Sequence, residues 1–190
     1  PEFTSLLQGS DHPLVVPVLL AGLQTNSRDE LLPLLVRHLP RAEATIRRML
    51  QSRQGADLAN AALLAARGRM VAAIPLLRKA LQHPDPAVQA AVIRSLGELG
   101  DHKSTPELRR KLQHQQSIVR RAAIEALSTL GDSRLAPQLL KLLRKGGEME
   151  VAAIAALGRM REVASLRSLH GRLPTATGNT RRALLRAIAE

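Results

Sequence analysis

Apolar residues recur along most of this chain at helical spacing. Leu108 and Leu112 stand four residues apart. Val119, Ile124 and Leu127 recur in the next segment with alanines between them. Residues three or four positions apart share one face of an α-helix, whereas a half-buried strand alternates apolar and polar residues. The pattern therefore predicts amphipathic helices and not strands.

The pattern itself repeats every 31 residues. The equivalent positions are Pro75, Pro106 and Pro137; Ile46, Leu77, Leu108 and Leu139; Leu50, Leu81, Leu112 and Leu143; and Leu96 and Leu127. After residue 143 the phase slips by one residue and then returns to the same spacing. A fixed period of this length is typical of stacked helical repeats, so we expect an elongated array.

Each period contains two helices. The first opens with a proline, which suits the first helical turn, and the second is followed by Gly100 or Gly131. Glycine ends a helix at low cost because it adopts the left-handed conformation freely. Asp101 and Asp132 come next, and we interpret them as helix caps and not as a pair of catalytic carboxylates.

About six helix pairs are expected on this template. The first helices lie near 13–25, 43–52, 71–82, 104–114, 135–145 and 163–173. The second helices lie near 28–39, 56–67, 86–99, 117–130, 148–160 and 179–190. Pro33 interrupts the second helix of the first unit, so we interpret 1–42 as a degenerate repeat and 43–190 as regular repeats of a single array over 1–190. The leucines expected to be buried between repeats are Leu77, Leu81, Leu108, Leu112, Leu139 and Leu143.

Two segments, Asp85 to Asp101 and Ser117 to Leu127, resemble the short HEAT-like repeat of the type named after phycobilisome lyases. The resemblance is strongest over 71–160 and weakest over 1–42. It implies an all-α fold, a right-handed α-solenoid with the first helices on the convex side and the second helices on the concave side. It implies no single activity, because function in such arrays depends on the surface and not on the fold.

The composition indicates the cellular compartment and the class of protein. The chain has no cysteine, which excludes disulfides and cysteine-ligated metals and is compatible with a reducing cytoplasm. No apolar run approaches the roughly 18 residues of a membrane span, and no signal peptide is apparent. The chain begins with Pro1 and stops inside a predicted helix. We therefore expect a piece of a longer cytoplasmic, bacterial protein.

Three enzyme families built on similar repeats were compared with the residues present. Deoxyhypusine hydroxylases carry His-Glu pairs as iron ligands, and this chain has no such dipeptide. Alkylpurine DNA glycosylases use aromatic side chains, but Phe3 is the only aromatic residue here. Bilin lyases are connected by name alone. His83 and His114 are one period apart without a further ligand at metal spacing. We therefore expect that the chain is not an enzyme and that it binds neither a metal ion nor a cofactor.

The net charge of +12 favours an anionic partner. Cations recur at the repeat spacing on the first helices, and we call this set the basic ridge: Arg47, Arg48, Arg78, Lys79, Arg109, Arg110 and Lys141. Stacking of repeats is expected to align them on the convex side. The second helices carry a mixed set expected on the concave face: Gln89, Arg94, Arg120, Glu125, Glu150, Arg181 and Arg186.

These surfaces lead to two hypotheses about function. The first is a protein-interaction scaffold or regulatory domain that binds a partner, acidic in character, through the concave face. The alternative is binding of a nucleic-acid backbone or another polyanion through the basic ridge, which would use phosphates because no aromatic platform is present. The basic ridge could equally be a solvated surface. Leu184, Leu185 and Ile188 also predict further repeats or self-association through the last repeat.

Overall fold

The structure is a computed structural model that describes residues 38–190 apart from 53, 148, 161–162 and 190. Within these residues the chain is helical and contains no strand. None of the described helices combines the length and the apolar character that a membrane span requires. The helices predicted for 13–25 and most of 28–39 lie outside the described residues.

The chain divides into two compact units, Pro1–Ser95 and Leu96–Glu190, and the division falls inside helix α7 (Pro86–Glu98). In the first unit, α4 (Leu39–Met49) packs against α5 (Gly55–Arg67). A 3₁₀ turn (Val71–Ala73) then leads into α6 (Ile74–Ala80). Among the described residues of this unit, the largest fully buried side chains are Ile46, Leu64, Leu77 and Ile93.

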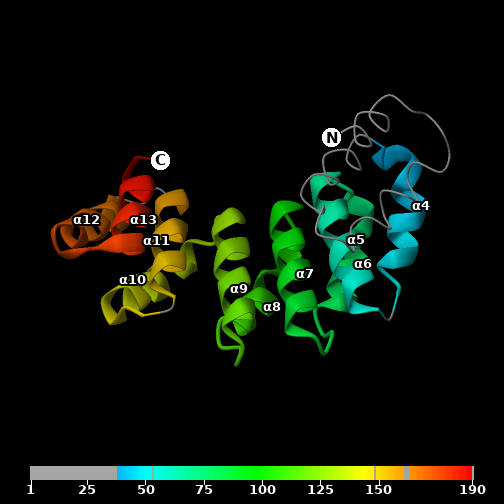
Figure 1. The fold of residues 1–190 in the computed structure, drawn as a ribbon, viewed down its shortest axis with the longest axis horizontal. Coiled ribbons are helices and arrows are strands. Elements are labelled where there is room, and N and C mark those ends of the chain that lie inside the picture. The colour runs from blue at the N-terminus through cyan, green and yellow to red at the C-terminus, as the bar shows by residue number, and fades with distance from the viewer. Residues whose placement is uncertain (1–37, 53, 148, 161–162, 190) are drawn as a thin grey trace. The chain divides into compact units, whose positions relative to one another are not determined.

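The second unit contains three helix pairs. These are α8 (Thr105–Lys111) with α9 (Ser117–Thr129), α10 (Ala136–Lys145) with α11 (Glu150–Met160), and α12 (Val163–Arg172) with α13 (Gly178–Ala189). The second helices α9, α11 and α13 follow one another side by side (Figure 1). The chain is therefore an all-α repeat structure, as the sequence pattern predicts.

The predicted helix boundaries from residue 56 onward are confirmed to within a few residues. The helix expected at 43–52 instead begins at Leu39, because Pro40 occupies its first turn. Each of the helices α6, α8 and α10 is preceded by a 3₁₀ turn and has proline in its first turn. Proline supplies the helical φ there without loss of a backbone hydrogen bond.

Five of the six leucines expected in the core are buried: Leu77, Leu81, Leu108, Leu139 and Leu143. Leu112 is the exception, because it is only half-buried. It lies in the turn that follows the short helix α8, where it caps the last helical turn. The prediction that Leu112 is a core residue is therefore wrong.

The turns between repeats end the second helices as the sequence predicts. Gly100 and Gly131 adopt left-handed backbone conformations, with φ of 72° and 69°. The next N–H in each turn, that of Asp101 or Asp132, donates to a carbonyl of the last helical turn at 3.0 Å. This is the Schellman arrangement, which satisfies carbonyls that the helix leaves without a partner. Arg69 occupies the corresponding position one period earlier, with φ of 51°.

Small residues bring consecutive second helices into close contact. A Cβ atom added at Gly97 would lie 2.7 Å from Cα of Ala126 in α9. One added at Gly158 in α11 would lie 2.8 Å from Cα of Ala187 in α13. Both distances are too short for real carbon atoms, so the helices pack backbone against backbone at these points. The abundance of alanine in the second helices is the sequence correlate of this packing.

Candidate interaction surfaces

The residues of the basic ridge all lie on first helices. Within the first unit, Arg47 and Arg48 are on α4, and the half-buried Arg78 and exposed Lys79 are on α6. Within the second unit, the half-buried Arg109 and exposed Arg110 are on α8, and Lys141 is exposed on α10. Each group belongs to its own unit, so one continuous ridge across the chain stays a prediction.

Local carboxylates neutralise part of this charge. Arg47 donates to Glu43 at 3.1 Å, and Arg110 donates to Glu107 at 3.0 Å. Each pair lies within one turn of a single helix. Exposed pairs of this kind contribute little to stability, but they reduce the positive potential that an approaching polyanion meets.

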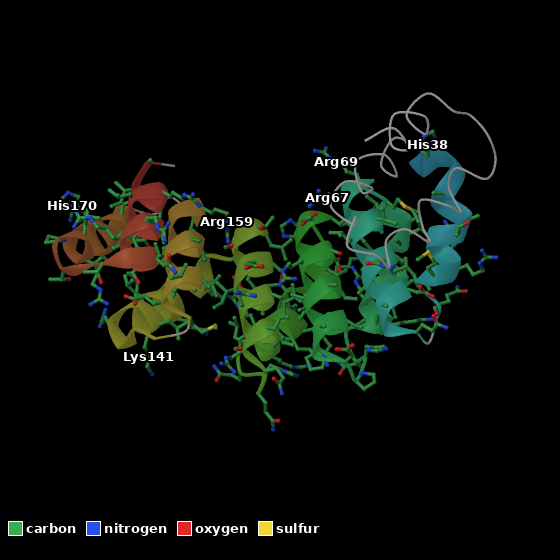
Figure 2. All side chains as sticks on the ribbon, in the orientation of Figure 1. His38, Arg67, Arg69, Lys141, Arg159 and His170 are labelled. Carbon is green, nitrogen blue, oxygen red and sulfur yellow. The ribbon has the colours of Figure 1, made fainter. Side chains whose placement is uncertain are left out.

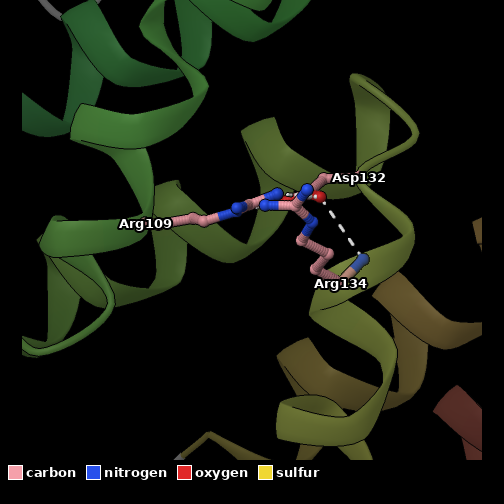
Figure 3. A network of polar contacts seen from close by, with 3 residues as sticks. All are labelled: Arg109, Asp132 and Arg134. Atoms are coloured by element: carbon pink, nitrogen blue, oxygen red, sulfur yellow. Dashed lines mark hydrogen bonds and ion pairs between the residues drawn. The ribbon is translucent and has the colours of Figure 1, made fainter.

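Within the basic ridge, Arg109 binds a carboxylate, that of Asp132, through two hydrogen bonds. Its Nε donates to Oδ2 of Asp132 at 2.6 Å, and its Nη2 donates to the other carboxylate oxygen. Arg134 adds a backbone N–H bond to Oδ1 at 3.3 Å, and Figure 3 shows both arginine side chains extending toward the carboxylate. Because the Asp132 side chain is only 7% exposed, this contact fixes α8 to the turn before α10.

The same contact shifts both ionisation equilibria. The hydrogen bond from Arg109 is the main cause that lowers the pKa of Asp132, and the nearby positive charges lower it further against the opposing effect of burial. Asp132 in turn raises the pKa of Arg109, mainly through the same hydrogen bond. A shallow hollow of about 420 Å³ surrounds this pair, and its one lining carboxylate is Asp132, which Arg109 already binds.

Two residues expected on the concave face, Gln89 and Arg120, bind the backbone of their own repeat. Gln89 is buried, and its Nε2 donates to the carbonyl of His83 at 2.8 Å. Arg120, one period later, donates to the carbonyls of His114 at 2.8 Å and Gln115 at 2.6 Å. Both side chains bind carbonyls of the turn that joins the two helices of a pair. The structure therefore gives them a role in holding the turn, which corrects their expected position on an open face.

The histidines of these turns have a matching role. Nδ1 of His83 accepts a hydrogen bond from the backbone N–H of Asp85 at 3.1 Å, and Nδ1 of His114 accepts one from Gln116 at 3.2 Å. Both side chains are half-buried. Among the described residues, no group of three or more His, Cys, Asp or Glu side chains is placed to hold a metal ion.

The remaining residues expected on the concave face differ in exposure and in their interactions with the rest of the chain. Glu150 is half-buried and accepts a hydrogen bond from Nη2 of Arg172 at 2.6 Å. Arg94 and Glu125 are half-buried and take part in further interactions. Arg181 and Arg186 are exposed on α13.

The sequence reasoning missed an exposed column that stands one residue after Arg120, Glu150 and Arg181. Its members are Arg121, Val151 and Arg182, all exposed. Together with residues one or two helical turns further along, they make a set that we call the inner face: Arg121, Glu125, Val151, Ala155, Arg159, Arg182 and Arg186. The repeat spacing shows which residues occupy equivalent positions in successive helices. Which of these positions are exposed depends on which side of each helix is buried.

Arg159 connects the inner face to the core of the second unit. Its Nε and Nη2 donate to Oγ of the buried Ser128 at 3.2 and 2.9 Å, so a side chain of α11 is fixed on α9. In the view of Figure 2, Arg159 lies on the upper side and Lys141 on the lower side of the repeat formed by α10 and α11. In this unit the residues of the inner face lie on second helices, whereas those of the basic ridge lie on first helices.

A family model described as HEAT repeats matches two overlapping stretches of the chain, residues 42–115 and 74–151. Together they cover more than half of the sequence and include both segments that carry the resemblance. The match does not test the phycobilisome-lyase subtype, which stays a prediction. No curated protein matches the chain.

Proposed function

We propose, because this chain belongs to the HEAT-repeat family, that it is a non-catalytic scaffold that binds a partner protein through the inner face of its second helices. HEAT repeats commonly serve as protein-interaction scaffolds. The proposal includes the cytoplasm as the compartment, with which the lack of cysteine is compatible.

The exposed column on the inner face is the observation that carries this proposal. Val151 is 42% exposed, and it stands between Arg121 and Arg182 in the order of the repeats. Protein interfaces are enriched in arginine and have apolar centres surrounded by polar groups. An apolar side chain flanked by arginines on packed helices fits a partner that carries acidic residues around an apolar anchor.

The polyanion alternative has weaker support. Glu43, Glu107 and Asp132 each bind one arginine of the basic ridge. Affinity for a phosphate backbone rises with the number of phosphates that basic side chains neutralise, so arginines already paired with carboxylates contribute less. The basic ridge therefore supports polyanion binding less well than its sequence suggests.

The proposal predicts that charge and polarity changes on the inner face abolish partner capture. The variant Arg121→Glu with Val151→Asp should lose the proteins that the wild-type chain retains from a cell extract. The matched control, Lys141→Glu with Arg144→Glu, changes two exposed cations of a first helix and should retain them. Both variants should keep the wild-type circular dichroism and melting temperature, because surface substitutions usually change stability little.

A salt series separates the two hypotheses. Binding to duplex DNA through phosphates weakens steeply between about 50 and 200 mM salt, whereas a protein interface with an apolar centre weakens much less.

If the control variant lost the captured protein and the inner-face variant kept it, the proposal would be wrong. Tight DNA binding that depends on Lys141 would favour the polyanion alternative.

A further inference from the structure

Arg159 is an exposed arginine whose side chain is nevertheless held in one place. Its Nε and Nη2 donate to Oγ of Ser128 at 3.2 and 2.9 Å. Ser128 is only 5% exposed, and its hydroxyl donates to the carbonyl of Glu125 at 2.8 Å. Because the hydroxyl hydrogen is used within α9, the oxygen is left to accept from the guanidinium. A buried, neutral acceptor therefore fixes the orientation of Arg159.

The contact with Ser128 leaves most donors of this guanidinium unused. A guanidinium carries five N–H donors, and Arg159 uses one on Nε and one on Nη2. The remaining three, one on Nη2 and two on Nη1, have no acceptor among the described residues. Together Nη1 and Nη2 form the end of a planar fork, which matches the two oxygens of a carboxylate. Arg159 thus presents a fixed two-donor edge on an exposed surface.

The charge of Arg159 is also uncompensated. Four other arginines are held by carboxylates, in the pairs Arg47–Glu43, Arg109–Asp132, Arg110–Glu107 and Arg172–Glu150. In the described part of the chain, no carboxylate forms an ion pair with Arg159. Exposure of an arginine would not by itself indicate a ligand, since the chain has many exposed arginines. Arg159 differs from them because its geometry is fixed while its charge stays available.

Fixation before binding makes this arginine suited to recognition. A mobile arginine loses side-chain freedom when a partner orders it, and this loss weakens binding. For Arg159 the loss already occurs on folding, through the contact with Ser128. Arginine is also one of the residue types in which the binding energy of protein interfaces is concentrated.

Arg159 lies on the same helix as the exposed apolar residue of the inner face. Val151, Ala155 and Arg159 follow one another at four-residue intervals along α11, so they are neighbours on its surface. Val151 is 42% exposed and the small Ala155 is half-buried. With a rise of 1.5 Å per residue, Val151 and Arg159 are about 12 Å apart along the helix. An apolar contact and a carboxylate contact are therefore offered at a defined separation.

Helix α11 lies between two other second helices, which distinguishes it from α13. It packs against both α9 and α13, so a helix added after α13 would pack on α13 and would not cover it. The apolar residues expected to be presented on α13 are less open than expected. Leu184 is fully buried, Ile188 is half-buried and Leu185 is 50% exposed, so that expectation is wrong for Leu184.

We infer that Arg159 determines the specificity of the inner face by binding a carboxylate of the partner, and that Ser128 is its positioning residue. The inference rests on the proposed function, because it names the chemistry that the partner presents there. A helix repeats its side chains at the same four-residue interval as Val151, Ala155 and Arg159. The partner segment is therefore an α-helix with an apolar side chain over Val151, a small one over Ala155 and aspartate or glutamate at Arg159.

The test compares two synthetic helical peptides of about 20 residues, long enough to form a helix. One carries leucine, alanine and glutamate at four-residue intervals, and the other has glutamine in place of glutamate. Each is made with these residues in both orders, so that both chain directions along α11 are covered. Fluorescence anisotropy at about 150 mM salt measures binding to the 190-residue chain. In the order that binds, the wild type should prefer the glutamate peptide by about tenfold or more.

Variants of the two residues separate positioning from charge. Ser128→Ala keeps the charge of Arg159 but removes its support, so it should reduce the preference for glutamate to about threefold. Arg159→Gln should abolish the preference, and Arg159→Lys should restore it only in part, because an ammonium group cannot reproduce the two-bond geometry. The matched control is Thr129→Ala, since Oγ1 of Thr129 donates to the same carbonyl of Glu125 at 3.0 Å without binding Arg159. This control and Arg144→Gln, which removes an exposed cation of α10, should keep the tenfold preference.

Several results would overturn the inference, given variants whose circular dichroism matches the wild type. These are binding of neither peptide, equal affinity of the wild type for both, and a glutamate preference that persists in Arg159→Gln. A lower melting temperature of Arg159→Gln with an unchanged preference would make Arg159 only a contact between α9 and α11. If Ser128→Ala does not fold, the exposed substitution Arg159→Lys gives the same comparison. Failure of the proposed function is a different result, in which Arg121→Glu with Val151→Asp keeps the protein captured from a cell extract.

Discussion

At the scale of single residues, the pair formed by Arg109 and Asp132 does more for the fold than for any partner. The Asp132 carboxylate accepts two hydrogen bonds from one guanidinium and one from a backbone N–H. A planar guanidinium matches a carboxylate in this two-bond geometry, which lysine cannot reproduce. A residue that sequence spacing assigns to a basic surface is therefore a connection between two repeats.

The lowered pKa of Asp132 leads to a prediction about pH. Its contribution to stability is fully present above the unfolded-state pKa of about 3.9 and is lost as pH falls through the lower folded-state value. At pH 7, Asp132→Asn should lower the melting temperature by roughly 3–6 °C. The difference from the wild type should stay constant down to about pH 5 and shrink below about pH 4.

Glu107→Gln is the control for this prediction, because the exposed Glu107–Arg110 pair contributes little to stability. Thermal melts of both variants between pH 3 and pH 8 measure the effect. A difference between wild type and Asp132→Asn that grew toward low pH would contradict the argument.

At the scale of helices, the sequence predicted most of what the structure contains, and particular residues explain both the success and the failures. The 31-residue spacing of buried positions such as Leu77, Leu108 and Leu139 is enforced by packing, so it predicts helix positions well. Turn chemistry is less visible. Gly100 and Gly131 mark their turns, but in the earlier turn Arg69 adopts the left-handed conformation and the glycine, Gly68, stands one residue before it.

The open surface was harder to predict for a geometric reason. Arg120 and Arg121 are neighbours in sequence, yet consecutive residues point about 100° apart on a helix. Arg120 turns back to the carbonyl of His114, whereas Arg121 is exposed. Periodicity identifies equivalent residues in each repeat, but it does not show which side chains satisfy a neighbouring turn. That information depends on the tertiary position of the carbonyls.

The close contact of α11 with α13 gives a prediction at the same scale. Gly158→Ala would ordinarily favour a helix by up to about 1 kcal/mol. Here the new methyl group meets the backbone of Ala187, and overpacking of this kind costs about 1–3 kcal/mol. We therefore expect a net loss of about 1 kcal/mol in the free energy of unfolding, measured by urea denaturation.

Gly171→Ala is the matched control, because Gly171 lies in helix α12 and a methyl group there meets nothing within 4 Å. It should raise the free energy of unfolding by up to about 1 kcal/mol, since only the helix propensity changes. Two variants of equal chemistry should thus have opposite signs. Stabilisation by Gly158→Ala would show that α11 and α13 are less closely packed than the structure indicates.

At the scale of the whole molecule, the excess of positive charge is spread over many sites. The chain has 28 lysines and arginines against 16 aspartates and glutamates. Ion pairs such as Arg109 with Asp132 act at contact distance, whereas cations on neighbouring helices repel one another over about 8–10 Å. Salt distinguishes these two effects, because it screens the longer interactions more strongly.

The Debye length falls from about 30 Å at 0.01 M to about 8 Å at 0.15 M ionic strength, which is shorter than the spacing between repeats. Repulsion between repeats should therefore weaken more than the contact pairs do, and the melting temperature should rise by a few degrees as sodium chloride increases over this range. Arg144→Gln with Arg167→Gln removes two exposed cations and should reduce the size of that rise. A melting temperature that falls with salt would mean that attractive pairs, and not the net charge of +12, dominate the electrostatic energy of the folded chain.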